Sequence, residues 1–113
     1  MSKLMKIFDI NVQEPYFSSI VSGKKTVEGR LNKGKFFDLQ VGDILRINDS
    51  VEYLVTAKNI YPSFREMIAA EGLINVIPNK KTMDEALSVY SKFFSKEDEL
   101  KYGVVGIKMI KRE

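Results

Sequence analysis

The 113-residue chain contains no cysteine, no histidine and no tryptophan. Without cysteine it has no disulfide, no thiolate nucleophile and no sulfur ligand for a metal. Without histidine it has neither a Ser-His-Asp triad nor a typical zinc site, so any acid–base chemistry must use lysine, carboxylates or tyrosine. We therefore expect no metal and no cofactor. Any aromatic side chain that stacks on a ligand has to be tyrosine or phenylalanine.

Long apolar runs are also missing. No stretch approaches the roughly 20 apolar residues that a membrane-spanning helix needs. The first residues, MSKLMKIFDI, lack a long apolar run followed by a small-residue cleavage site. We therefore expect a cytoplasmic protein with no membrane partner. Its length, with 44% apolar and 29% charged residues, is typical of a single globular domain over residues 1–113.

Hydrophobic spacing predicts the secondary structure. Alternation of apolar and polar residues favours strands at 5–12, 26–31, 44–47, 51–61 and 103–111. Helical spacing, with a capping box before two of the segments, favours helices at 14–23, 63–72 and 82–94. The sequence therefore predicts an α+β fold, in which a mixed or antiparallel sheet of about five short strands curls into a small barrel flanked by about three helices.

The segment GKKTVEGR, residues 23–30, concentrates charge. Gly23 suits the left-handed position just past a helix, so Lys24 and Lys25 lie at a helix C-terminus, where cations are mildly favoured. In the strand that follows, Glu28 and Arg30 share one face with about 7 Å between them. Lys25 has the other parity and joins them only if the chain bends or bulges as it enters the strand.

The remaining cations form no extended stripe. The net charge is +3 and the isoelectric point is near 9.1, a mild preference for anionic partners. Lys33, Lys35, Lys80 and Lys81 lie in predicted loops, where lysines are commonly solvated and have no further role. We therefore expect a small ligand or a short single strand in preference to a long duplex.

Three features together resemble one known family. The pattern G-x-K-x-x-E-x-R follows a short N-terminal helix, VGD precedes the third strand, and YGVVGIK opens the last strand. This arrangement resembles the ASCH family, whose fold is a PUA-like β-barrel, and the resemblance extends from about Met5 to Lys111. It implies that Lys25, Glu28 and Arg30 line a cleft beside the barrel.

The resemblance also implies binding of RNA or of a nucleoside- or nucleotide-like ligand. Arg30 can contact a phosphate or a base edge through two donors, and Glu28 can accept from an exocyclic amine. A tyrosine such as Tyr16, Tyr61 or Tyr102 can stack on a base. The candidate ligand-binding residues are Lys24, Lys25, Thr26, Glu28, Arg30 and Tyr102.

Two alternatives remain open. Some family members are amidohydrolases that release acetate from N4-acetylcytidine, using a lysine, a threonine three residues later and a distant glutamate. By that resemblance the candidate catalytic residues are Lys25, Glu28 at the threonine position, and Glu71, with Thr26 close by. In the other alternative, Glu28 and Arg30 form an exposed ion pair, the lysines cap a helix, and the domain is structural or interacts with other proteins without a ligand.

Overall fold

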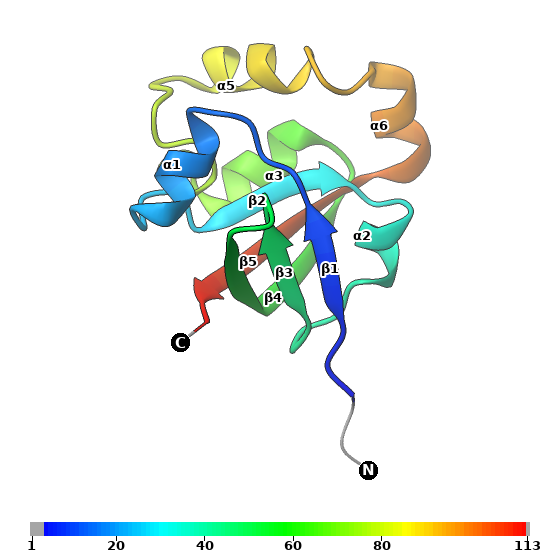
Figure 1. Cartoon of the computed structure of the whole chain (residues 1–113). Helices are drawn as coiled ribbons and strands as arrows, with labels where there is room; N and C mark the ends of the chain where they lie inside the picture. Colours follow the sequence, from blue (N-terminus) through cyan, green and yellow to red (C-terminus); the bar gives the residue numbers. More distant parts are fainter. Residues whose placement is uncertain (1–3, 113) are drawn as a thin grey trace.

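The computed structural model describes residues 4–112. Five strands form one mixed sheet in the order β1-β3-β4-β5-β2, in which only β1 and β3 run parallel. The sheet curls into a half-barrel with β1 and β2 at its two edges (Figure 1). The predicted α+β fold with a mixed sheet is confirmed. The strands are β1 Ile7–Ile10, β2 Val27–Leu31, β3 Ile44–Ile47, β4 Val51–Tyr61 and β5 Val104–Lys111.

Six helices occur within the described residues, twice the number predicted. They are α1 Tyr16–Val21, α2 Lys35–Asp38, α3 Phe64–Glu71, α4 Leu73–Val76, α5 Met83–Tyr90 and α6 Lys96–Tyr102. The helices α1, α3 and α5 match the three predictions, and the Ser63 and Thr82 side chains accept from the Glu66 and Glu85 amides as the capping boxes imply. The helices α2 and α4 are single turns, too short to show a hydrophobic period.

The helix α6 was not predicted, although its N-terminus carries a related signal. The Ser95 hydroxyl accepts a hydrogen bond from the Asp98 amide at 3.1 Å. This cap has aspartate where the capping box has glutamate or glutamine. None of the residues of α6 is fully buried, so the helix has no apolar stripe from which a sequence pattern could locate it.

Side chains on the two faces of the sheet form two cores. One core contains Ile10, Leu45, Val55 and Ile107 and lies against α1. The other lies between the sheet and the helices α3 to α5, and Val27 contributes to it from β2. In Figure 1, α5 and α6 run along one side of the molecule, and α1 lies near α5. The edge strand β2 therefore runs close to the helices that complete the fold.

Two facing glycines let α3 approach the sheet closely. Gly29 of β2 and Gly106 of β5 are directly opposite each other. A Cβ atom on Gly29 would lie 2.5 Å from the terminal methyl group of Met67, and one on Gly106 would lie 3.2 Å from its Cγ. Larger residues at these positions would therefore have to displace side chains of α3, those of Met67 and Glu71.

Candidate functional site

A bend before β2 turns Lys25 into the protein. Gly23 has φ +84°, and the amides of Lys24 and Lys25 both donate to the Ser19 carbonyl at 3.0 Å. The Thr26 amide then donates to the Asn75 carbonyl at 2.9 Å, before the strand begins at Val27. Because residues 23–26 are outside the strand, its alternation does not apply to Lys25. Lys25 is only 4% exposed and faces the same region as Glu28.

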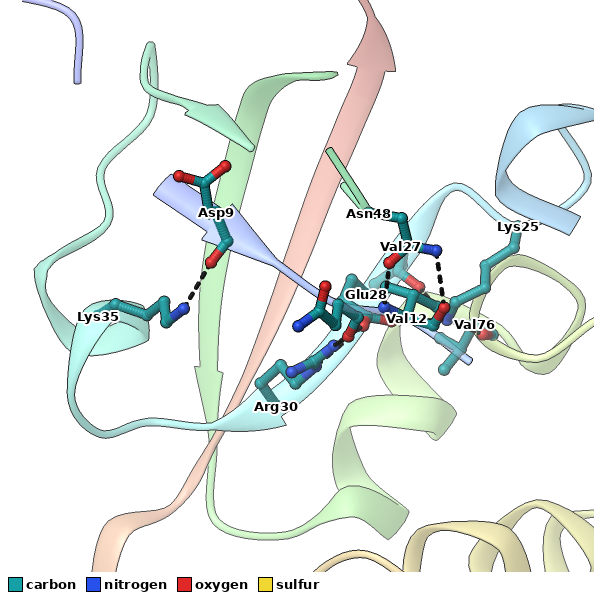
Figure 2. Close-up of polar contacts among 10 residues, drawn as sticks. Asp9, Val12, Lys25, Val27, Glu28, Arg30, Lys35, Asn48 and Val76 are labelled. Atoms are coloured by element: carbon teal, nitrogen blue, oxygen red, sulfur yellow. Dashed lines mark hydrogen bonds and ion pairs between the residues drawn. The ribbon is translucent and has the colours of Figure 1, made fainter. Parts of the chain in front are cut away.

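The Lys25 ammonium group has three acceptors. Its Nζ lies 2.8 Å from the Val27 carbonyl oxygen, 2.5 Å from that of Val76 and 3.2 Å from Glu28 Oε1. Figure 2 shows the Lys25 chain reaching toward Val27 and Val76. An ammonium group carries three N–H donors, so each of them has a partner here. This geometry fits the charged form of lysine.

Arg30 contacts the same carboxylate from the other side. Its Nε and Nη2 atoms each lie 2.9 Å from Glu28 Oε2, and Nη2 also donates to the Asn11 carbonyl at 2.8 Å. The guanidinium carbon lies 5.1 Å from the centre of the Phe36 ring. Glu28, only 5% exposed, is therefore held between two cations, and the cluster carries a net charge of +1 when all three groups are ionised.

Burial and charge act against each other in this cluster. Burial alone would raise the pKa of Glu28, but Lys25 and Arg30 outweigh it and hold that pKa below its ordinary value. Burial lowers the pKa of Lys25 from its ordinary value, and Glu28 offsets only part of this. Glu28 is buried, so this arrangement is not a solvated surface ion pair. The alternative in which Glu28 and Arg30 form an exposed pair is therefore wrong for Glu28.

The cluster forms one wall of a cavity of about 320 Å³. Four aromatic side chains line it, those of Tyr16, Tyr90, Phe93 and Phe94. Tyr90 and Phe94 also stack on Phe64, with 4.4 Å between the ring centres of Phe64 and Tyr90 and 5.2 Å between those of Phe64 and Phe94. Burial raises the pKa of Tyr90, so its phenol stays neutral. The lining residues are Asn11, Val12, Gln13, Tyr16, Lys25, Glu28, Gly29, Arg30, Ile77, Val89, Tyr90, Phe93 and Phe94.

A second hollow of about 410 Å³ adjoins this cavity and shares Arg30, Phe93 and Phe94 with it. Lys33 and Lys35, which the sequence suggested were simply solvated, contribute to its lining. Figure 2 shows Lys35 directed toward Asp9, whose main-chain oxygen accepts from its Nζ. The lining residues are Arg30, Leu31, Lys33, Gly34, Lys35, Phe36, Phe93, Phe94 and Asp98.

Three of the predicted ligand-binding residues lie outside both hollows. Lys24 and Thr26 are exposed on the bend before β2 and line neither of them. Tyr102, at the end of α6, also lines neither, and the Nζ atom of Lys33 lies 4.8 Å from the centre of its ring. Of the candidate ligand-binding residues, the structure thus brings only Lys25, Glu28 and Arg30 together.

The side chain of the candidate catalytic residue Glu71 has partners other than Lys25. Its Oε2 atom accepts from the Tyr61 hydroxyl at 2.5 Å and from the Asn59 amide at 3.0 Å. Burial and the neighbouring carboxylate raise the pKa of Tyr61 to about 12, so this hydroxyl remains a donor. Glu71 lies over Gly106 on the α3 side and lines neither hollow, so the structure does not assemble it with Lys25 and Glu28.

Several residues of the cavity were not identified from the sequence. Tyr90 and Phe94 belong to a stripe at helical spacing that was assigned to the core, and they do contribute to the second core. The same side chains also line the cavity. Asn11 takes part through its main-chain carbonyl, which no side-chain pattern marks. The sequence feature that could have indicated these cavity residues is the grouping of Tyr90, Phe93 and Phe94 at the end of a helix.

Residues 4–112 contain neither a metal-binding cluster nor a membrane-spanning helix. No group of three or more histidine, cysteine, aspartate or glutamate residues in this part of the chain could hold a metal ion. Among its helices, none is long and apolar enough to cross a membrane.

Fold and cavity together define a small α+β domain with a charged, aromatic-lined pocket at the edge of a curled mixed sheet. The chain belongs to the ASCH domain family, whose sequence model matches residues 10–112. The resemblance seen in the sequence is therefore confirmed. Members of this family are generally RNA-binding.

Two solved structures are similar over nearly the whole chain. The crystal structure of the hypothetical protein PH0355 has a TM-score of 0.90 and 38% identity, with 96% of this chain and 100% of that chain covered. The solution structure of protein PF0455 from Pyrococcus furiosus has a TM-score of 0.82 and 37% identity, with 95% and 98% covered. No curated protein matches the chain significantly.

The buried cluster predicts a specific response to acid. Because the pKa of Glu28 in the folded state lies below the ordinary value of 4.5, its stabilising contribution is complete above that value and is lost as the pH falls through the folded-state pKa. Between about pH 5 and pH 2, the free energy of unfolding should fall more steeply for the natural protein than for Glu28→Gln. Urea denaturation at a series of pH values measures this. Parallel curves for the two proteins would contradict the prediction.

Proposed function

We propose that the cavity at the edge of β2 binds one base of single-stranded RNA or a nucleotide-like ligand. The observation that supports this most strongly is the convergence of Lys25, Glu28 and Arg30 on one aromatic-lined cavity. Its volume of about 320 Å³ is near the lower end of the roughly 300–1,000 Å³ range of small-molecule sites. A group the size of a nucleobase therefore suits it better than a duplex.

The cavity offers complementary groups for a base. Arg30 contacts Oε2 of Glu28 through two nitrogen atoms, whereas Oε1 contacts Lys25, so the second lone pair of Oε1 can accept from a ligand amine. The Phe93 ring is half exposed and lies at the wall, where an aromatic ring can stack on a base. The net positive charge of the cluster favours an anionic ligand.

Arg30→Ala should weaken binding of a short single-stranded RNA by about tenfold or more, because it removes a charge-assisted donor from the cavity wall. Lys81→Ala is the matched control, since Lys81 is exposed and lines neither hollow. Fluorescence anisotropy at several salt concentrations measures both affinities, and circular dichroism checks the fold. Equal losses in the two variants would indicate diffuse charge and not a site.

One observation favours a second use of the cavity, the hydrolysis of N4-acetylcytidine. Burial lowers the pKa of Lys25, which is the direction that a lysine base requires. Against it, all three donors of Lys25 have acceptors, and Glu71 and Thr26 lie outside the cavity. Binding is therefore the better supported of the two functions.

A further inference from the structure

The second hollow has an excess of positive charge next to the proposed base site. Arg30, Lys33 and Lys35 line it, whereas Asp98 is the only carboxylate among its described lining residues. It shares Arg30, Phe93 and Phe94 with the first cavity, so the two spaces are neighbours. A ligand with an aromatic part and an anionic part could occupy both at once.

The cations of this hollow retain free donors. Lys35 uses one donor on the Asp9 carbonyl, and Lys33 lies over the ring of Tyr102, which offers no carboxylate. Within residues 4–112 neither ammonium group forms a close ion pair with a carboxylate, although the charge of Lys35 helps to lower the pKa of Asp9. Arg30 contacts Glu28 and Asn11 through Nε and Nη2, and its Nη1 atom has no partner among the described residues. These donors match the oxygens of a phosphate group.

We propose that the second hollow binds a phosphate attached to the nucleoside in the first cavity. The ligand class is then a phosphorylated nucleotide, free or within an RNA chain, and not a free nucleoside. Arg30 lies at the junction, where a base in one space and its phosphate in the other would be joined through the sugar. This inference rests on the proposed function, because the phosphate site needs a base in the neighbouring cavity.

Titration calorimetry at low salt compares the ribonucleosides cytidine, uridine, adenosine and guanosine with their 5′- and 3′-monophosphates and with a short single-stranded RNA. For the base that binds best, a monophosphate should bind about tenfold or more tightly than its nucleoside. In the double variant Lys33→Ala/Lys35→Ala this advantage should be largely lost while nucleoside affinity is unchanged. Both lysines are exposed, so the variant is expected to fold.

The control variant Lys108→Ala/Lys111→Ala removes the same charge from exposed residues of β5 that line neither hollow. It should leave the phosphate advantage intact. Equal affinities for the nucleoside, its monophosphates and the RNA, or equal losses in the two double variants, would overturn the phosphate site while leaving base binding in place. Absence of binding by all the nucleosides, nucleotides and RNA would overturn the proposed function itself. A gain for the RNA but for neither monophosphate would assign the hollow to a chain phosphodiester.

Discussion

Glu28→Gln should lower the free energy of unfolding by about 3–5 kcal/mol at neutral pH, because it leaves two cations without their shared buried carboxylate. Lys25 Nζ lies 3.2 Å from one oxygen of Glu28, and Arg30 Nε lies 2.9 Å from the other. A glutamine side chain would direct its amide donors toward one of these cations. Urea denaturation followed by circular dichroism measures the change.

The chain provides a matched surface control for this substitution. Glu52 pairs with Arg112 at 2.9 Å, but about a third of the Glu52 side chain is exposed. Glu52→Gln should therefore cost below about 1 kcal/mol. Similar losses for the two variants would contradict the buried-cluster interpretation and would indicate that Glu28 contributes no more than a solvated surface ion pair does.

A double-mutant cycle separates the Lys25–Glu28 contact from general damage. Lys25→Met removes the cation but also leaves the carbonyls of Val27 and Val76 without its donors. The double variant Lys25→Met/Glu28→Gln should lose less stability than the sum of the two single losses, by about 1 kcal/mol or more. This is the size of coupling expected for groups in direct contact.

The sequence predicted those parts of the molecule that depend on local chemistry. Period-two alternation located β2 to within one residue of Val27–Leu31, and the capping serine and threonine located the starts of α3 and α5. Gly23 was expected in the left-handed region and has φ +84°. Each of these features is fixed by one side chain and its near neighbours, so a single sequence is sufficient to find it.

The arrangement of the cavity depends on contacts between distant segments. The carbonyl of Val76, 51 residues beyond Lys25, is an acceptor for its ammonium group, and Arg30 reaches the carbonyl of Asn11 across 19 residues. Main-chain groups of this kind leave no trace in a side-chain pattern. Strand alternation predicted Lys25 on the other face of the strand from Glu28. The bend before the strand, in which the Ser19 carbonyl accepts from the Lys24 and Lys25 amides, brings Lys25 to the same side as Glu28.

The same geometry bears on the chemistry that the family resemblance suggested. An amide hydrolase without metal or histidine needs a base, a proton donor and a group that stabilises the oxyanion. Lys25 can act as a base only after losing a proton, and its contacts with Glu28 and two carbonyls fit the protonated form. Arg30 could stabilise an oxyanion, but it already contacts the Glu28 carboxylate. Thr26 and Glu71 line neither hollow.

We therefore expect slow or absent release of cytidine from N4-acetylcytidine by the natural protein. Any residual rate should rise with pH across the neutral-to-basic range, because the neutral amine of Lys25 is the active form. Lys25→Ala should abolish it, and Lys25→Arg should do so as well, since arginine stays protonated. Glu28→Thr tests whether the family's threonine restores activity, with its folded fraction measured in parallel because the buried carboxylate is lost. Chromatography of released cytidine decides the question. Fast turnover by the natural protein would make hydrolysis the leading function, because the contacts that hold the Lys25 proton would then have to break when substrate binds.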